Sequence, residues 1–517
     1  MNRPIRKVAI ALVLLLAAIF INMNVVQVAD NNTYNDTGKY ADNRLPVLAQ
    51  YSSPRGQIDA QGTALAKSVA TNDELKYLRQ YPLAAVYAPI TGFDSIVYGT
   101  DGIEAAQDKV LSGSDPRQFG RQIADLFTGR NPRGGNVELT LSKAAQQAAY
   151  AAMKGPNGQL RRGAVVALDP TTGAVLAAVS TPSYDPNKLS SHDTDGISAY
   201  YAALQKDPAQ PMLNRALNQL YPPGSVFKVI VSAAALKAGL KPTDQVPAPN
   251  AYWPFGGTGS CRGSTACIEN FGGETCQNGS TAQLIYAFAK SCNTAFAQLA
   301  VERLKGPAIA SEAQKFGFDG NQLSIPLPVA KSTVGTQADL AEPGSLAHSS
   351  FGQQDVRMTP LQGAMIAAAV ANGGMLMTPY LVRQELSSNF SVLSNTSPTE
   401  MGQVLDSAQN QQLEQMMQAV VTAPEGTGQA AQISDINGIT VGGKTGTADT
   451  GIFHNGVQTP PHAWFCGFGL VNGVPKIAVA VVIENGGVSG DETTGGLAAA
   501  PVAKAVMEAY LKSPQGR

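Results

Sequence analysis

The sequence lacks an excess of charge of either sign. Lysine and arginine together number 37, and aspartate and glutamate 38, among 517 residues. This balance implies no basic face, so nucleic acid is not expected as a partner. Histidine is also scarce, and the four that occur follow no metal-ligand spacing. They are His192, His348, His454 and His462. We therefore expect neither a metal ion nor a cofactor.

Long apolar runs are missing except at the N-terminus. There an apolar stretch extends from Val8 to about Ala29 and follows a short basic segment. Its length suits one membrane-spanning helix, and the positive charge before it places that end in the cytoplasm. We predict a cytoplasmic tail over residues 1–7, a membrane anchor over 8–29 and an extracytoplasmic remainder. A cleaved signal peptide is the alternative, although no clear cleavage site follows the run.

Cysteine is rare, with five residues in the chain. Cysteines outside the cytoplasm meet oxidising conditions and can pair. Cys261, Cys267 and Cys276 lie close together in a glycine-rich stretch, whereas Cys292 and Cys466 lie elsewhere. The spacings do not resemble zinc-binding pairs. We expect one disulfide among the first three.

The length of the chain predicts two or more domains beyond the anchor. We assign residues 30–135 to a small N-terminal domain and 136–517 to a larger one. In the larger one, "RRGAVVALDPTTGAVLAAVS" and "HAWFCGFGLVNGVPKIAVAVVIENG" each predict a β-hairpin, and a helical block lies between them. This order predicts an α+β domain whose antiparallel sheet is built from both ends and packs against helices. The polar stretch 387–400 is expected to be a surface loop or excursion.

The segment "YPPGSVFKVI" places two polar side chains in an apolar context. Two prolines and a glycine favour a turn, after which Ser225 begins a helix and Lys228 lies one turn later on the same face. A serine hydroxyl needs a base to become a nucleophile, and apolar neighbours lower the pKa of a lysine. Ser225 and Lys228 are therefore candidates for nucleophile and base. A surface or capping pair is the structural alternative.

A second candidate is "GGKTGT", which follows "GITV", the predicted start of a strand. Lys444, Thr445 and Thr447 offer an amine and hydroxyl groups along one strand edge, which suits a peptide with a terminal carboxylate. Gly446 lets another chain approach closely. An ordinary edge strand protected by lysine is the alternative reading.

The third candidate, "SCN", follows a predicted helix and contains Ser291 and Asn293. A hydroxyl could transfer a proton and an amide could hold a substrate amide. In isolation this tripeptide is weak evidence, because serine and asparagine commonly cap helices or form loops.

The three motifs together are informative. Their order, Ser-x-x-Lys, Ser-x-Asn and Lys-Thr-Gly, is that of class A β-lactamases and penicillin-binding proteins. The chain resembles class B penicillin-binding proteins, and among them the actinobacterial penicillin-binding protein A type. "RGQIDAQGTALAKS", "STPSYDPN", "GQQDVRMTPLQGA" and "ANGG" also match the style of that family. Cys292 departs mildly from the Asp that β-lactamases have between Ser and Asn.

The resemblance implies the serine β-lactamase/penicillin-binding transpeptidase fold, in which helices flank an antiparallel sheet and an all-helical subdomain adjoins it. It implies peptidoglycan D,D-transpeptidase activity, with Ser225 attacking the D-Ala-D-Ala bond of a stem peptide and Lys228 as its base. An amine of another stem peptide would resolve the acyl-enzyme, and β-lactams would acylate the same serine.

The remaining roles are also carried over from the family. Ser291 would relay a proton to the leaving amine, and Asn293 would hold the substrate amide. Lys444, Thr445 and Thr447 would bind the terminal carboxylate. The backbone N–H groups of Ser225 and Thr447 would form the oxyanion hole.

Other enzymes on the same fold are alternatives. A D,D-carboxypeptidase uses water as the acceptor, and a β-lactamase hydrolyses the opened drug. A glycosyltransferase domain is not expected, because only about a hundred residues separate the anchor from the larger domain, and a non-enzymatic penicillin sensor lacks a cytoplasmic output. The family also suggests a lipid-linked peptidoglycan polymerase of the SEDS type as a partner, by analogy only.

Overall fold

The structure is a computed structural model that describes residues 3–24, 50–118, 133–155, 157–257, 261, 267–454, 457–486 and 494–516. The chain forms two compact units. One comprises residues 1–54 and 69–78, and the other comprises residues 55–68 and 79–517.

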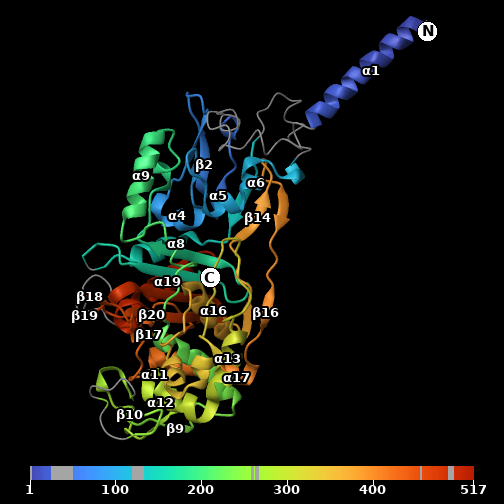
Figure 1. The fold of residues 1–517 in the computed structure, drawn as a ribbon. Coiled ribbons are helices and arrows are strands. Elements are labelled where there is room, and N and C mark those ends of the chain that lie inside the picture. The colour runs from blue at the N-terminus through green and yellow to red at the C-terminus, as the bar shows by residue number, and fades with distance from the viewer. Residues whose placement is uncertain are drawn as a thin grey trace. The chain divides into compact units, whose positions relative to one another are not determined.

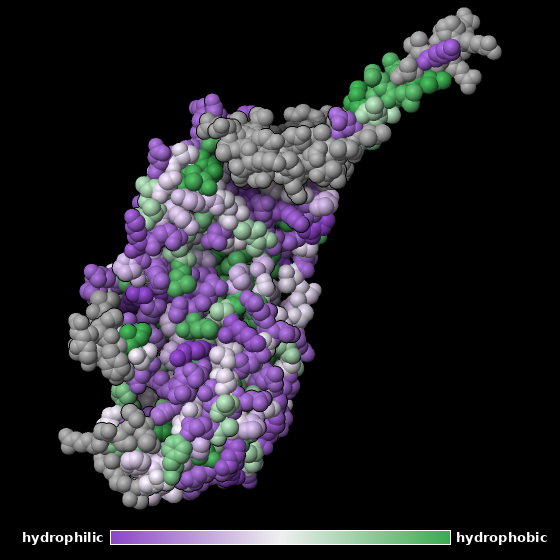
Figure 2. Space-filling model, viewed as in Figure 1, coloured by the Kyte–Doolittle hydropathy of each residue, from purple (hydrophilic) through white to green (hydrophobic). Residues whose placement is uncertain are grey.

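The first unit contains helix α1 (Arg3–Asn24). It overlaps the predicted anchor, and its apolar side chains from Leu12 to Leu16 are exposed (Figure 2). No helix in the described part of the chain meets the length and apolarity required of a membrane span. Residues 25–49, which include the end of the predicted anchor and the start of the predicted N-terminal domain, lie outside the described residues. The anchor thus stays a prediction.

The larger unit contains a five-stranded antiparallel sheet with the order β17-β20-β21-β7-β8. Figure 1 labels its strands β17 and β20. The strands are β7 (Gly163–Leu168), β8 (Val175–Thr181), β17 (Ile439–Ala448), β20 (His462–Val471) and β21 (Val474–Ile483). Both predicted hairpins are present, and the two ends of the sequence meet where β21 pairs with β7. The predicted sheet is therefore confirmed, and β17 lies at its edge.

Both faces of this sheet are covered by helices. Val165 and Val479 pack with helices α8 (Lys143–Ala152) and α19 (Ala500–Lys512) on one face. The alternate residue Val166 packs with α16 (Pro360–Ala371) on the other. Because neighbouring strand residues point to opposite faces, burial on both sides explains the continuous apolar runs in the sequence.

The block between the sheet segments is mainly helical. It includes α10 (Lys228–Lys237), α11 (Leu284–Lys290), α12 (Asn293–Gln298), α13 (Lys305–Lys315), α14 (Gln337–Ala341), α15 (Pro343–Ser349) and α17 (Ser407–Thr422). Short pairs join β9 (Gln245–Pro247) to β12 (Thr281–Gln283) and β10 (Ala251–Tyr252) to β11 (Ile268–Glu269). The subdomain expected to be all-helical thus also contains small strands.

A second sheet has the order β15-β14-β6-β1-β2-β3. Its strands are β1 (Ile58–Ala60), β2 (Thr63–Ala70), β3 (Tyr77–Gln80), β6 (Asn136–Leu139), β14 (Val382–Leu386) and β15 (Val392–Asn395). The stretch 387–400, expected to be a surface loop or excursion, contains the strand β15 and leads into β16 (Glu400–Gln403). The cause is long-range pairing. The backbone groups of these polar residues form hydrogen bonds with β14, and local sequence patterns do not reveal such pairing.

The smaller elements complete the described chain. They are α4 (Ala84–Thr91), β4 (Asp94–Ser95), β5 (Gly99–Thr100), α5 (Gly102–Ala106), α6 (Asp108–Ser112), α9 (Thr194–Lys206), β13 (Met375–Met377), β18 (Phe453–His454), β19 (Val457–Gln458) and α18 (Gly495–Ala498).

A buried charge cluster centres on Glu104 of α5. Its carboxylate accepts hydrogen bonds from Arg55 Nε at 2.6 Å and from Arg79 Nε at 2.6 Å. Burial alone would raise the pKa of Glu104, but the two guanidinium groups lower it below its usual value. Arg55 also forms a 2.6 Å ion pair with Asp108. Arg55 opens the "RGQID" stretch, so this cluster gives that stretch a structural role.

Replacing Glu104 by alanine is expected to lower the free energy of unfolding by about 3–5 kcal/mol, because it leaves two buried guanidinium groups without their shared partner. Urea unfolding followed by circular dichroism measures the change. The exposed pair between Lys512 and Asp435, 2.6 Å apart, provides the control: Lys512→Ala should cost less than about 1 kcal/mol. Equal effects of the two variants would contradict the prediction.

Candidate active site

The turn that carries Ser225 is held against strand β17. A 3₁₀ segment, η4 (Gly224–Phe227), contains Ser225 and leads into α10. Gly224 has φ +54°, and a Cβ atom on it would lie 2.7 Å from the carbonyl oxygen of Thr447. Only glycine fits this close approach. Trp464 Nε1 donates a 3.0 Å hydrogen bond to the carbonyl of Pro222 and holds the start of the turn.

Lys228 is fully buried at the first turn of α10. Its Nζ donates hydrogen bonds to the carbonyl oxygen of Ser291 at 2.7 Å, to Asn293 Oδ1 at 2.8 Å and to Ser291 Oγ at 3.3 Å. Burial, and then the nearby charge of Lys444, hold its pKa well below the usual value. The lowered pKa makes the neutral form, which can accept a proton, more accessible than it is for an exposed lysine.

The loop between α11 and α12 presents Ser291 and Asn293 to the lysines. Ser291 ends α11 in the left-handed region with φ +67°, and Asn293 begins α12. Lys444 Nζ donates to Ser291 Oγ at 2.8 Å. The Ser291 hydroxyl thus lies within hydrogen-bond distance of both lysine amines, and it can pass a proton between them.

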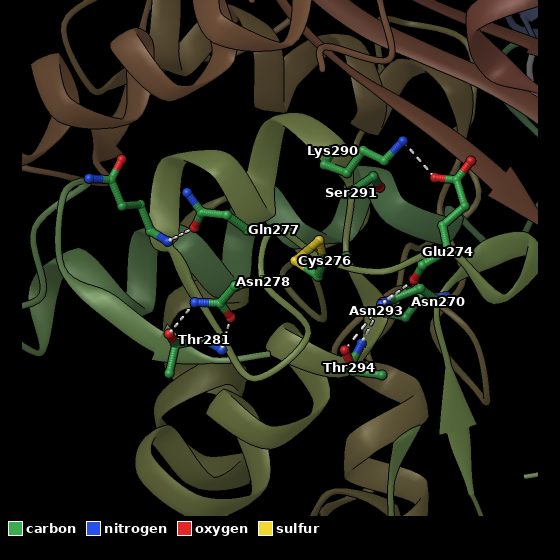
Figure 3. The surroundings of a disulfide bond; sticks show 12 residues. Asn270, Glu274, Cys276, Gln277, Asn278, Thr281, Lys290, Ser291, Asn293 and Thr294 are labelled. Atoms are coloured by element: carbon green, nitrogen blue, oxygen red, sulfur yellow. Dashed lines mark hydrogen bonds and ion pairs between the residues drawn. A yellow bond between two sulfur atoms is a disulfide. The ribbon is translucent and has the colours of Figure 1, made fainter. Parts of the chain in front are cut away.

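The cysteine pattern differs from the expectation in one respect. Cys261 pairs with Cys267, within the group of three, but Cys276 pairs with Cys292 (Figure 3). The middle residue of "SCN" is therefore tied to a neighbouring loop. Sequence separation did not indicate this second bond, because α11 brings the chain back beside Cys276 only in the folded domain. Cys466 is free and buried.

Lys444 lies on β17 and is fully buried. Besides Ser291 Oγ, its Nζ contacts the carbonyl oxygen of Thr445 at 3.1 Å. Burial lowers its pKa to about 7. A small change in its surroundings, such as the arrival of a carboxylate, would therefore decide whether the amine carries a proton.

Thr445 has a partner that sequence analysis missed. Its Oγ1 lies 2.6 Å from Oγ1 of Thr427, in the loop between α17 and β17. This contact orients the Thr445 hydroxyl beside the cavity. Nothing in the local sequence around Thr427 suggested the role, since it depends on the packing of two loops.

One cavity of about 380 Å³ connects the three motifs. Its walls include Ser225, Phe271, Glu274, Cys276, Lys290, Ser291, Asn293, Phe351, Thr427, Thr445, Thr447 and Asp449. Lys228 and Lys444 are buried beneath it. Gly446 brings β17 against the turn that carries Ser225, because a Cβ atom there would lie 2.6 Å from the carbonyl oxygen of Pro223. The fold thus assembles all eight residues predicted for the site.

A second buried network involves Tyr221, which precedes the turn that carries Ser225. Tyr221 donates its hydroxyl to Glu484 at 2.8 Å, and Arg215 Nε donates to the same carboxylate oxygen at 2.8 Å. Burial alone would raise the pKa of Glu484. The pKa is nevertheless lowered below its usual value, mainly by the positive charge of Arg215. Sequence analysis did not identify Glu484, because its partners lie more than 260 residues away.

Replacing Lys444 by methionine should separate stability from activity. Methionine avoids the cost of burying an amine, so the free energy of unfolding at pH 7 is expected to rise by about 1 kcal/mol or more. If Lys444 binds the terminal carboxylate, as the family resemblance implies, penicillin acylation should slow by roughly 10–100-fold, because the drug's carboxylate loses a cation.

The stability gain has a defined pH dependence. The folded pKa is about 7 and the ordinary value is 10.5. Between these values the unfolded wild type binds more protons than the folded form, so wild-type stability rises with pH. The advantage of methionine should therefore shrink from pH 7 to pH 9 in thermal unfolding. Exposed Lys241→Met is the control and should change stability by no more than about 0.5 kcal/mol. A constant advantage would contradict the prediction.

Ser225 lies on the wall of a cavity lined by hydroxyl and amide groups, and two buried lysines donate to Ser291 on the same wall, an arrangement typical of a serine acyltransferase site. Comparison with known proteins agrees with this class. Residues 163–508 match the penicillin binding protein transpeptidase domain, and residues 55–137 match the penicillin binding protein A dimerisation domain.

Full-length relatives support the same assignment. The peptidoglycan D,D-transpeptidase PbpA of Mycolicibacterium smegmatis is 44% identical over 519 residues, covering 99% of each chain. PbpA of Mycobacterium tuberculosis is 43% identical over 515 residues, again covering 99% of each. The solved ceftriaxone acyl-enzyme complex of M. tuberculosis penicillin-binding protein A superposes with a TM-score of 0.83 at 43% identity, and the match covers 90% of this chain and 100% of that one. The chain belongs to the penicillin-binding protein transpeptidase family, which confirms the resemblance inferred from the motifs.

Proposed function

We propose that Ser225 is the nucleophile and Lys228 the base of a peptidoglycan D,D-transpeptidase. The protein is a monofunctional serine-type enzyme that cross-links stem peptides and is acylated by β-lactams. The observation that carries the residue assignment is the single cavity that joins Ser225 to the "SCN" and "KTGT" motifs above two buried lysines. The M. tuberculosis relative has been solved as acyl-enzyme complexes with ceftriaxone, imipenem and penicillin G, which supports the same chemistry here.

Acylation would begin when the Ser225 hydroxyl attacks the carbonyl carbon of the D-Ala-D-Ala bond. Neutral Lys228 takes the hydroxyl proton as the new C–O bond forms. No described hydrogen bond joins Lys228 to Ser225 in the free enzyme, and catalytic hydrogen bonds often tighten only when substrate is bound. The lowered pKa of Lys228 supports this role.

The developing oxyanion would be stabilised by the backbone N–H groups of Ser225 and Thr447. The approach of Gly224 to the Thr447 carbonyl supports this pairing, because it brings the two backbones together. Asn293 would hold the substrate amide. Lys444, Thr445 and Thr447 would bind the terminal carboxylate, with Gly446 permitting the close packing.

Collapse of the tetrahedral intermediate breaks the C–N bond and releases D-alanine. Its leaving nitrogen needs a proton, and Ser291 would deliver one from the lysines. The contacts of Ser291 Oγ with Lys228 at 3.3 Å and Lys444 at 2.8 Å support a relay. An acceptor amine would then attack the ester carbonyl and give a proton to Lys228. The ester C–O bond breaks, the Ser225 oxygen takes that proton, and the new amide bond completes the cross-link.

The same fold supports hydrolysis as a second outcome, giving a D,D-carboxypeptidase or a β-lactam-hydrolysing enzyme. Product analysis separates these possibilities. Cross-linked dimers identify a transpeptidase, shortened monomers a carboxypeptidase and opened drug a β-lactamase.

The topology and organisation of the chain are further parts of this proposal. Residues 1–7 would be cytoplasmic, 8–29 would anchor the enzyme in the cell membrane, 30–135 would form a docking domain and 136–517 would be the extracytoplasmic transpeptidase domain. The basic N-terminal segment and the apolar run support this topology. A SEDS-type polymerase is the proposed partner, and the docking domain is the surface offered to it.

Labelling with a fluorescent penicillin, followed by digestion and mass mapping, tests the assignment of the nucleophile. The drug should be found on the peptide that contains Ser225. An adduct on any other serine would overturn the assignment.

A further inference from the structure

The charged residues on the wall of the active-site cavity leave one carboxylate unpaired. Lys290 Nζ and Glu274 form an ion pair at 2.6 Å and neutralise each other (Figure 3). Asp449 also lines the cavity, and no described residue donates a hydrogen bond or forms an ion pair to its carboxylate. Apart from the buried lysines, the described cavity wall therefore has one uncompensated negative charge.

The position of Asp449 follows from the geometry of β17. Thr445, Thr447 and Asp449 all line the cavity, whereas the residues between them do not. This is the alternation of a strand, and Asp449 is the first residue after β17 ends. Its carboxylate thus lies on the cavity side of the sheet edge, about 7 Å beyond Thr447 along the chain.

One particular residue of a bound peptide substrate would lie beside Asp449. Because β17 is an edge strand, an extended peptide can add alongside it. With its terminal carboxylate at Thr445 and its reacting carbonyl at the N–H of Thr447, the peptide continues toward Asp449 with the residues that precede the reacting bond. The side chain of the residue before D-Ala-D-Ala would then lie beside the carboxylate.

We propose that Asp449 is a specificity residue that binds a side-chain ammonium group on the stem-peptide residue preceding D-Ala-D-Ala. The enzyme thereby prefers donors with a free diamino acid at that position. This inference rests on the proposed function, since it uses the binding direction assigned to the terminal carboxylate. The cavity wall partly desolvates Asp449 and raises the pKa of its carboxyl, so a cation beside it is favourable.

The ammonium group of the acceptor peptide is a second source of the same charge. The acceptor amine must lose its proton before it attacks the acyl-enzyme. A carboxylate beside it would stabilise the protonated, unreactive form. The donor side chain, which keeps its charge throughout the reaction, suits Asp449 better.

The test measures D-alanine release by the full-length protein from two tripeptides. Both are Nα-acetyl-Lys-D-Ala-D-Ala, and one is also acetylated on Nε. The wild type should favour the free amine by about 10-fold in kcat/KM. Asp449→Asn should reduce this ratio to about one, and Asp449→Glu should restore part of it. Asp195→Asn, on helix α9 outside the cavity, is the matched control and should keep the wild-type ratio.

Each outcome has a distinct meaning. A wild-type ratio of one, or a preference that survives in Asp449→Asn, overturns the inference while leaving the proposed function intact. If Asp449→Asn changes only the share of acyl-enzyme that reacts with an added amine, the inference is also overturned. Asp449 would then bind the acceptor instead of the donor. Failure to release D-alanine from either peptide, together with no penicillin adduct on Ser225, contradicts the proposed function itself. Penicillin labelling of Asp449→Asn verifies that its site is folded.

Discussion

Replacing Ser225 by alanine is expected to abolish covalent labelling by penicillin. The substitution removes the hydroxyl that forms the ester in the proposed mechanism, whereas the backbone groups and the buried lysines remain in place. Ser225 is partly exposed, so the loss of its hydroxyl should change the free energy of unfolding by no more than about 0.5 kcal/mol. Intact-protein mass spectrometry and thermal unfolding measure the two quantities.

The helix that follows Ser225 supplies a matched control. Ser232 lies on α10, and its buried hydroxyl has no hydrogen-bond partner among the described residues. Ser232→Ala should therefore be labelled like the wild type. An adduct that forms at an undiminished rate on Ser225→Ala would show that another residue is the nucleophile.

Lys228→Ala should have the next largest effect, slowing penicillin acylation by about 10²–10⁴-fold without unfolding the protein. That range is typical when a general base is removed. Lys228→Arg separates proton transfer from hydrogen bonding, because arginine can donate to the "SCN" loop but cannot give up its charge. If the lysine is the base, arginine should not rescue the rate.

The pH dependence of acylation provides an independent test. A base acts in its neutral form, so the wild-type rate should rise with pH as Lys228 loses its proton. Since its pKa is lowered, this rise should end well below the ordinary lysine value of 10.5. Lys228→Ala should lose the rise, whereas exposed Lys241→Ala should keep it. A near-normal rate in Lys228→Ala would assign the base to another group, a question that is disputed for related enzymes.

Much of the fold could be predicted from local patterns. The hairpins around Gly173 and Gly473 follow from apolar strands on either side of turn residues, and both occur in the structure. The prolines and glycine before Ser225 predict a turn into a helix, and the structure has that turn as η4. These features are local, because strand periodicity and turn preferences depend on neighbouring residues.

The candidate site was predictable only as a set of motifs in order. That Lys228 and Lys444 approach the same Ser291 hydroxyl depends on three segments separated by 63 and 153 residues. Likewise, the partner of Cys292 and the contact between Thr427 and Thr445 arise from the packing of loops.

By itself, the sequence determined the chemistry that is available: a serine, two lysines and the hydroxyl and amide groups of the three motifs. It also determined the strands and turns that carry them. Tertiary structure alone decided which groups meet, how deeply the lysines are buried and that Asp449 faces the cavity without a partner among the described residues. The physical reason is that long-range pairing and desolvation depend on the complete packed domain, whereas local sequence specifies only the conformations of short segments.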